Sequence, residues 1–422
     1  DVNDLAFRTW LREMRGLRAE GAGTAATPAS PDRRPVRPTL VVEIASEPEL
    51  SHGFFSRLLY DQIARSLTES VDVDVVRGPL PIEQSLRLPE GALSVQAHIA
   101  TLPGGSIWLR LSLEDMARTA IRWSSTLKLP APIVELDDNP PVLGLIHRLV
   151  FAAIEALSSY NPTRDCDGDY RAAIMAASAF RRMFRLRHQD LEASAALLDH
   201  AIAIAPRGLY HAMRAQLSTI RAIERQSCAA ELRELSEADI AAALASEPLN
   251  SSVLSAAANT KLVFDNDVAS SLILSRQGVR SNRSNPLAWW SLANAALYAG
   301  DHEAAYSAAV FAQQLADSSS LKPWADFQRS LTAAVHGRID EGVAFAMSAH
   351  VLSPSFRPPL RYLIALQARS GAVTESRDAV RKLGRLEVDF SVERLISDPA
   401  YPASMLRRSR LADADIMKRI EL

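Results

Sequence analysis

Five prolines divide the second half of the chain into Ala-rich segments of similar length. Each proline follows one apolar helical pattern and precedes another; they are Pro206, Pro248, Pro286, Pro323 and Pro354. A loose period of roughly 30–45 residues is typical of stacked helix pairs. The spacing therefore predicts a helical solenoid that binds a partner on a long surface, rather than one compact catalytic core.

The composition sets further limits. A chain of 422 residues is too long for one hydrophobic core, so we expect two or more domains. The net charge of −2 gives no general attraction to nucleic acid or to an anionic membrane. The two cysteines, Cys166 and Cys228, are too few for a disulfide framework or a four-ligand zinc site, which favours a reducing, cytoplasmic location. No stretch approaches the roughly 20 continuous apolar residues of a membrane span, so no membrane contact is expected.

The N-terminal segment differs from the rest of the chain. Residues 1–20 read as an amphipathic helix whose apolar stripe includes Leu5, Trp10 and Leu17. We interpret this helix as the end of a preceding activation-type domain, against which it would dock, with an N-terminal module before Asp1. Residues 21–38 have no periodicity and are rich in Gly, Ala, Pro and Ser, which is typical of a linker.

Residues 39–160 form the second segment. A short apolar run at 39–45 and a helical pattern with Phe54 and Leu58 precede a strand pattern at 71–76. Alternating runs at 93–99, 107–113 and 120–129 then indicate a β-meander, and 142–157 reads as an amphipathic helix. This order predicts a small α/β sandwich with helices covering one face of the sheet.

Residues 161–422 are expected to be helical throughout. The clearest repeat is 285–316, where large and small residues alternate as in tetratricopeptide repeats. Helix pairs are expected near 170–205, 208–246, 252–282, 287–317, 323–352 and 359–384, of which the second and third are degenerate. The predicted fold class is a multi-domain α+β protein: a small α/β sandwich followed by an all-α, tetratricopeptide-like solenoid.

Three sequence blocks carry a family resemblance. The segment Phe7-x-x-Trp10-Leu11-Arg12 resembles the end of the activation domain of bacterial SARP and AfsR regulators. The block 53–67 (GFFSRLLYDQIARSL) looks like the first helix of the TolB-like α/β module, which occurs with CadC-like DNA-binding domains or adenylate cyclases and a tetratricopeptide tail. The block 390–395 (FSVERL) is similar to the exit from the last repeat of such tails. The resemblance implies that this chain is the sensing half of a regulator whose output domain lies N-terminal.

The sequence contains no recognisable catalytic motif. There is no phosphate-binding Gly loop and no Gly-x-Ser-x-Gly motif. The acidic run 165–169 departs from a calcium loop, because its glycine falls at the fourth position and Ala176 replaces the bidentate glutamate. We therefore expect no enzyme activity, no cofactor and no metal.

Two sets of residues are candidates for partner binding. In the first helix of the repeat at 285–316, Trp289 is expected to pack in the seam of the pair, and the stripe Trp290, Asn294 and Tyr298 would then face the concave groove. Gln328 and Arg361 would extend that surface. A basic run would meet an acidic partner or the DNA backbone, with a solvated helix face as the alternative; its members are Arg181, Arg182, Arg185 and Arg187.

Three functions stay open at this point. The first is the regulatory half of a bacterial transcriptional regulator, which binds a protein or small-molecule signal and meets DNA only through a domain that this chain lacks. The second is the regulatory tail of an adenylate cyclase-type enzyme, and the third is a protein–protein scaffold. A protein or peptide in the solenoid groove is the expected partner, and homodimerisation stays open.

Overall fold

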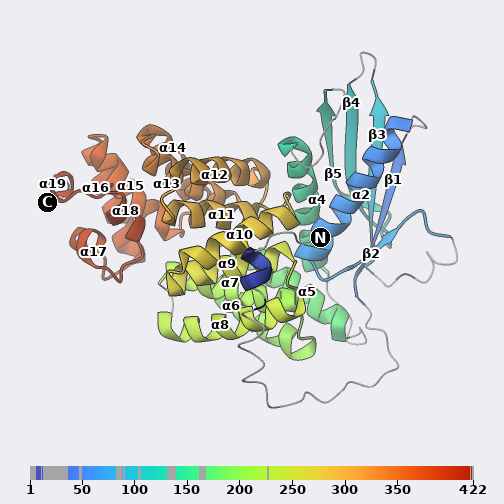
Figure 1. Ribbon diagram of the computed structural model, residues 1–422, viewed down its shortest axis with the longest axis horizontal. Helices are drawn as coiled ribbons and strands as arrows, with labels where there is room; N and C mark the ends of the chain where they lie inside the picture. The colour runs from blue at the N-terminus through green and yellow to red at the C-terminus, as the bar shows by residue number, and fades with distance from the viewer. Residues whose placement is uncertain are drawn as a thin grey trace.

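The computed structural model describes residues 6–10, 12, 37–46, 50–81, 88, 91–102, 106–130, 139–160, 168–225, 228–418 and 420. Along its longest axis, a five-stranded sheet at one end is followed by a layer of two helices and then by the helical solenoid (Figure 1). The fold is thus a small α/β unit joined to a tetratricopeptide-like array of helix pairs, as the periodicities predicted.

The sheet is mixed, with strand order β2-β1-β3-β4-β5. Strand β1 pairs in parallel with both β2 and β3, whereas β3, β4 and β5 form an antiparallel meander. The strands are β1 (Thr39–Ser46), β2 (Asp74–Arg77), β3 (Leu93–Thr101), β4 (Ile107–Asp115) and β5 (Ala120–Leu129). Alternate residues such as Leu40, Val95 and Leu111 are buried on one face, while Trp108 on the other face is 47% exposed.

Two helices cover the buried face of the sheet. They are α2 (Leu50–Ser70) and α4 (Pro140–Ser158). Helix α4 also packs against solenoid helices α5 and α12, so it is buried on both sides. It is the one helix of the described residues that is long and apolar enough to cross a membrane, and 72% of its most apolar window lies inside the protein. Its apolar composition is therefore explained by its position between two layers.

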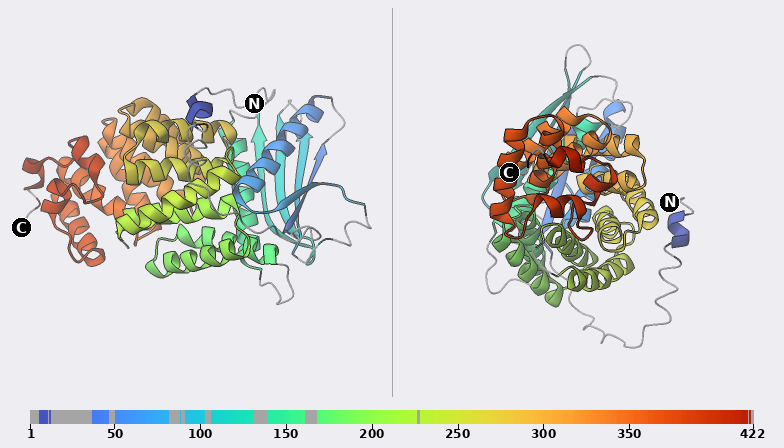
Figure 2. Two further views of the ribbon diagram at one scale, coloured as in Figure 1. Left: turned by 60° about the horizontal axis from the view of Figure 1, so that its bottom comes forward. Right: turned by 90° about the vertical axis from the view of Figure 1, so that its left-hand side faces the viewer.

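Six helix pairs build the solenoid, which Figure 2 shows from two further directions. The pairs are α5 (Gly168–Met183) with α6 (His188–Ile204), α7 (Gly208–Ile223) with α8 (Ala229–Ser246), α9 (Ser251–Asp265) with α10 (Val268–Ser281), α11 (Pro286–Tyr298) with α12 (His302–Ala316), α13 (Lys322–Val335) with α14 (Ile339–Leu352), and α15 (Arg357–Arg369) with α16 (Val373–Leu386). Short helices α17 (Val392–Ser397), α18 (Ser404–Arg408) and α19 (Ala414–Met417) follow. All five prolines lie between pairs or in the first turn of the next pair, where a missing N–H costs no helical hydrogen bond.

The turn inside each pair needs one residue in the left-handed conformation. In the last three pairs this residue is Gly300, Gly337 or Gly371, with φ between 81° and 88°. In the first three pairs it is Leu186, Arg225 or Asn266, with φ between 52° and 62°. Glycine adopts this conformation without a steric penalty, so the last three pairs are easy to recognise in the sequence and the earlier ones are not.

The described residues of the N-terminal helix dock on the solenoid, and that this helix ends a preceding domain stays a prediction. Residues 6–10 are helical, and Phe7 and Trp10 are 0% and 9% exposed. Both belong to one hydrophobic cluster with Ile240 of α8 and Leu254 of α9. These apolar residues are covered as expected, but helical periodicity says nothing about which surface covers them. The rest of the predicted 1–20 helix and most of the 21–38 linker lie outside the described residues.

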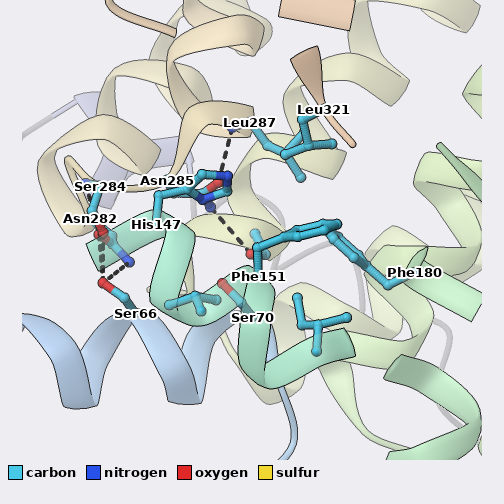
Figure 3. A pocket seen from close by; sticks show the side chains of 13 residues that line it. Ser66, Ser70, His147, Phe151, Phe180, Asn282, Ser284, Asn285, Leu287 and Leu321 are labelled. Atoms are coloured by element: carbon cyan, nitrogen blue, oxygen red, sulfur yellow. Dashed lines mark hydrogen bonds between the residues drawn. The ribbon is translucent and has the colours of Figure 1, made fainter. Parts of the chain in front are cut away.

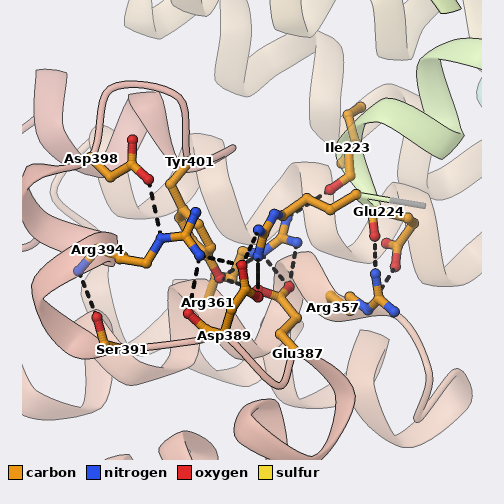
Figure 4. Close-up of polar contacts among 11 residues, drawn as sticks. Ile223, Glu224, Arg357, Arg361, Glu387, Asp389, Ser391, Arg394, Asp398 and Tyr401 are labelled. Atoms are coloured by element: carbon orange, nitrogen blue, oxygen red, sulfur yellow. Dashed lines mark hydrogen bonds and ion pairs between the residues drawn. The ribbon is translucent and has the colours of Figure 1, made fainter. Parts of the chain in front are cut away.

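The solenoid closes on itself through a polar cluster with a buried centre, which we call the closure cluster: Glu224, Arg225, Arg357, Arg361, Glu387, Asp389 and Tyr401 (Figure 4). Arg361 is 0% exposed; its Nε donates to Glu387 Oε1 at 3.1 Å and its Nη1 donates to the carbonyl oxygen of Ile223 at 2.8 Å. Arg225 donates to Glu387 and to Asp389 at 3.1 and 2.6 Å. The end of α7 is thus tied to α15 and to the segment after α16, which lie far along the chain.

Glu224 is the member of this cluster whose charge is least well compensated. Burial raises the pKa of Glu224 to about 7, although Arg361 and Arg357 lower it. Its carboxylate oxygens find no hydrogen-bond donor among the described residues. The folded-state pKa of Glu224 lies above the unfolded value near 4.5. The contribution of this side chain to folding stability is therefore complete below pH 4.5, where it is protonated in both states, and it is lost as the pH rises through about 7.

We therefore expect Glu224→Gln to stabilise the protein at high pH. The free energy of unfolding should rise by on the order of 2–3 kcal/mol relative to wild type at pH 8, and the two proteins should converge near pH 4.5. Urea unfolding from pH 4.5 to 8 measures this difference. The exposed Glu393→Gln is the matched control and should show no such trend. A Glu224→Gln protein that is less stable than wild type at pH 8 would show that the carboxylate is a net stabiliser.

Candidate functional site

The candidate site lies where the α/β unit meets the solenoid. Helix α2 supplies Gln62, Ser66 and Glu69 on one face, four and three residues apart, so that they point together toward the solenoid. The facing loop between α10 and α11 supplies Asn282, Ser284 and Asn285, and Asn285 also caps α11.

These groups form a hydrogen-bond network. Gln62 Nε2 donates to Asn282 Oδ1 at 2.9 Å, and the hydroxyls of Ser66 and Ser284 lie 2.6 Å apart. Glu69 accepts from the backbone N–H of Ser251 at 3.2 Å and from its hydroxyl. Burial raises the pKa of Glu69, although both bonds from Ser251 lower it. The carboxyl sits at the N-terminus of α9, where free N–H groups favour an acceptor.

A second contact ties the sheet to the solenoid. Tyr210 of α7 donates its hydroxyl to Asp72 Oδ2 at 2.5 Å, and Arg207 lies 3.7 Å from the same carboxylate. Burial and the Asp72 charge raise the pKa of the Tyr210 hydroxyl above its usual range, so the phenol stays protonated. The two contacts fix the α/β unit on the second and third helix pairs.

A cavity opens beside this network, and we call it the polar compartment. It is partly open to solvent. Its polar lining comes from several elements, and its apolar lining comes mainly from α4 and α5 (Figure 3). The lining residues are Ser66, Ser70, His147, Val150, Phe151, Ile154, Phe180, Ser252, Asn282, Ser284, Asn285, Leu287 and Leu321.

An adjoining cavity, the apolar compartment, lies among the first helices of the pairs. It is also partly open to solvent, and it shares Phe180, Ser252 and Leu287 with the polar compartment. The other lining residues are Met183, Leu209, Ala212, Met213, Gln216 and Ala256. His147 and several serines line the polar compartment, but no hydrogen bond joins His147 to these serines among the described residues, and His147 Nε2 lies 3.3 Å from Ser319 Oγ instead. No group of three or more His, Cys, Asp or Glu side chains in the described part of the chain could hold a metal.

No model of a known protein family matches this chain, and no curated protein sequence matches it. Among solved structures, a chain of the APC/C hetero-tetramer Cut9–Hcn1 aligns with a TM-score of 0.42 and 15% identity over 64% of this chain and 51% of that chain. This chain therefore spans about half the length of that neighbour. Yeast Tom70 aligns with a TM-score of 0.34 and 11% identity over 68% of each chain. Likenesses this distant carry no argument about function, and the site is interpreted from its own geometry.

The prediction that Trp290 lines an open groove is wrong. Its side chain is 6% exposed, packs edge-on against Trp324 of α13 at 5.3 Å, and donates Nε1–H to Gln328 at 3.1 Å. Trp289 is partly buried against Phe311 of α12, the second helix of its own pair, at 4.3 Å. The next pair in the array covers the face of α11 that an isolated pair would leave open.

The other predicted groove residues are also covered. Gln328 is 1% exposed beneath Trp290, and Arg361 lies inside the closure cluster. Tyr298 is half-buried; its hydroxyl lies 2.7 Å from Ser404 Oγ, and the guanidinium of Arg408 lies 5.0 Å from its ring centre. Asn294 is half-buried on the same helix. The C-terminal segment therefore occupies part of the surface that the sequence assigned to a partner.

The basic run divides into two kinds of residue. Arg182 lies 3.4 Å from the buried Asp190, and Arg181 is half-buried beside it. Arg185 and Arg187 are exposed at the turn into α6. The four arginines therefore do not form a single exposed patch.

Sequence reasoning missed the residues of the two compartments. Their one local signal is the run 281–286 (SNRSNP), a cluster of mainly small polar residues before a proline-started helix. Such a run is typical of a helix cap, and only the folded chain shows that it also faces α2.

Proposed function

We propose that this chain is a non-enzymatic regulatory module that transmits an interaction at the solenoid to a transcriptional output domain on its N-terminal side, in the cytoplasm of a bacterium. The observation that carries the proposal is the docking of the N-terminal helix. The segment that resembles the end of a bacterial activation domain packs Phe7 and Trp10 onto the second and third helix pairs. A change in those pairs would reach the helix directly.

The docked α/β unit supports the same function. Helix α2 and the Asp72 carboxylate contact the second and third pairs and the loop after them through hydrogen bonds, and two compartments lie beside these contacts. Polar contacts between domains are typical of interfaces that rearrange. Binding at the compartments would therefore bias the same helix pairs that hold Phe7 and Trp10.

Two variants of the full-length gene product test the proposal. Trp10→Ala removes the buried ring of the N-terminal helix, whereas Arg8→Ala changes an exposed residue two positions away. In cells that make each protein at wild-type level, we expect Trp10→Ala to change a defined set of transcripts several-fold and Arg8→Ala to leave them unchanged. The same set should respond to deletion of the gene.

Unchanged transcripts in both the Trp10→Ala strain and the deletion strain would overturn the transcriptional function. A nucleotide-cyclase activity that appears in the full-length product and responds to Trp10→Ala would favour the enzyme-tail alternative. Turnover of nucleotides, esters or peptides by the chain itself would overturn the non-enzymatic assignment.

A further inference from the structure

The described residues that line the two compartments at the junction carry no charge. None of them is Asp, Glu, Lys or Arg. Among these described residues His147 is the one titratable side chain; burial and the neighbouring Arg148 lower its pKa to about 3, so it is neutral at physiological pH. An ionised ligand group would lose its hydration here without gaining a counter-charge.

The apolar compartment carries one unused hydrogen-bond donor. Gln216 is 4% exposed, and its Oε1 accepts from Asn259 Nδ2 at 3.1 Å, which fixes the orientation of the amide. Its Nε2 has no hydrogen-bond partner within the described residues. A buried donor without a partner destabilises the folded protein. A ligand that places a hydrogen-bond acceptor at this position would remove that cost and bind more tightly.

The remaining lining suits a flexible apolar group. Met183 and Met213 line the apolar compartment together with Leu209 and Phe180, and methionine adapts its shape to what it contacts. The adjoining polar compartment shares Ser252 with it and is lined by hydroxyls and amides of the α2 network. The site thus offers an apolar end with a single donor and a polar, uncharged end.

We propose that the joined compartments bind a neutral amphipathic small molecule: an uncharged compound with a short hydrocarbon part and a carbonyl or hydroxyl oxygen that accepts from Gln216 Nε2. This deepens the proposed function and rests on it for its regulatory meaning, since it names the class of signal. The binding itself is a property of the chain and can be measured without any transcriptional readout.

A matched probe series tests the charge and shape of the site. Hexanamide, hexanoate and hexylamine share a six-carbon chain and differ in the charge of the head group at pH 7.5. In the full chain labelled with ¹³C-methyl methionine, we expect hexanamide to shift the Met183 and Met213 signals saturably, and the two ions to bind at least tenfold more weakly. Met347, which is 40% exposed on α14, is the internal reference and should not move.

Two variants separate the donor from the cavity. Gln216→Leu should weaken hexanamide binding by about tenfold, the value of one buried hydrogen bond. Ala256→Val reduces the space in the apolar compartment and should also weaken binding, while the helical signal and melting temperature report that each variant is folded. If either variant fails to fold, the wild-type probe series still decides the question.

The proposal is overturned if hexanamide leaves Met183 and Met213 unshifted, if the charged probes bind as well as hexanamide, or if a folded Gln216→Leu protein binds hexanamide as well as wild type. These results would leave the transcript response to Trp10→Ala untouched. Conversely, a lost transcript response with intact hexanamide binding would overturn the regulatory function alone.

Discussion

Replacing Trp290 by alanine is expected to lower the free energy of unfolding by about 3–5 kcal/mol, because the side chain fills the space between two helix pairs. The substitution removes the edge-on contact with Trp324 and leaves the buried amide of Gln328 without its Nε1–H donor. Urea unfolding followed by far-ultraviolet circular dichroism measures this cost without relying on tryptophan fluorescence.

The neighbouring tryptophan provides the control. Trp289 packs on Phe311 but keeps part of its surface in water, and its Nε1 donates to the carbonyl of Arg283 at 2.8 Å. We expect Trp289→Ala to cost about half as much, since less apolar surface is lost. A small loss for Trp290→Ala with a large one for Trp289→Ala would restore the original groove assignment and contradict the packing described above.

Arg361→Ala should destabilise the protein by about 3–5 kcal/mol, because it leaves a buried carboxylate with fewer donors. The Glu387 side chain is 2% exposed. Although burial raises the pKa of Glu387, Arg361 and the Tyr401 hydroxyl hold it below its usual range. Without the guanidinium, the carbonyl of Ile223 and the ring of Tyr401 also lose a contact. Urea unfolding at pH 7 measures the loss.

Two further proteins make this prediction specific. Arg381→Ala breaks an exposed pair with Asp378 and should leave the free energy of unfolding almost unchanged. The double variant Arg361→Met/Glu387→Met should recover a large part of the single-variant loss, because it removes both charges of the pair together. A double variant that is as unstable as the sum of its two singles would mean that Arg361 acts by packing and not through its ion pair.

The sequence predicts the strands and helix pairs whose residue patterns repeat along the chain. Period-two alternation places the strands near residues 93–129, and proline spacing places all six helix pairs close to their observed bounds. The two pairs predicted as degenerate, the second and the third, are among those whose turns lack glycine and use Arg225 or Asn266.

Contacts between distant segments leave no such local signal. Trp290 is covered by the next helix pair, Arg361 is reached by the end of α7, and Phe7 and Trp10 dock on helices far along the chain. An apolar or charged stripe predicts that a surface is covered or paired, but the partner depends on how the array curves. The candidate site was missed for the same reason, since its lining comes from α2, α4 and several solenoid helices.

The closure cluster also bears on how this array could change during evolution. Open repeat arrays gain or lose a repeat at little cost, because each unit interacts only with its neighbours. Here the turn inside the second pair must meet the sixth pair and the segment after it, so the three pairs between them set the span of a ring. Duplicating or deleting one pair would separate Arg225 from Glu387 and leave buried charges unpaired on both sides. The repeat number is therefore locked at its present value, and the array should unfold as one cooperative unit instead of fraying pair by pair from its end.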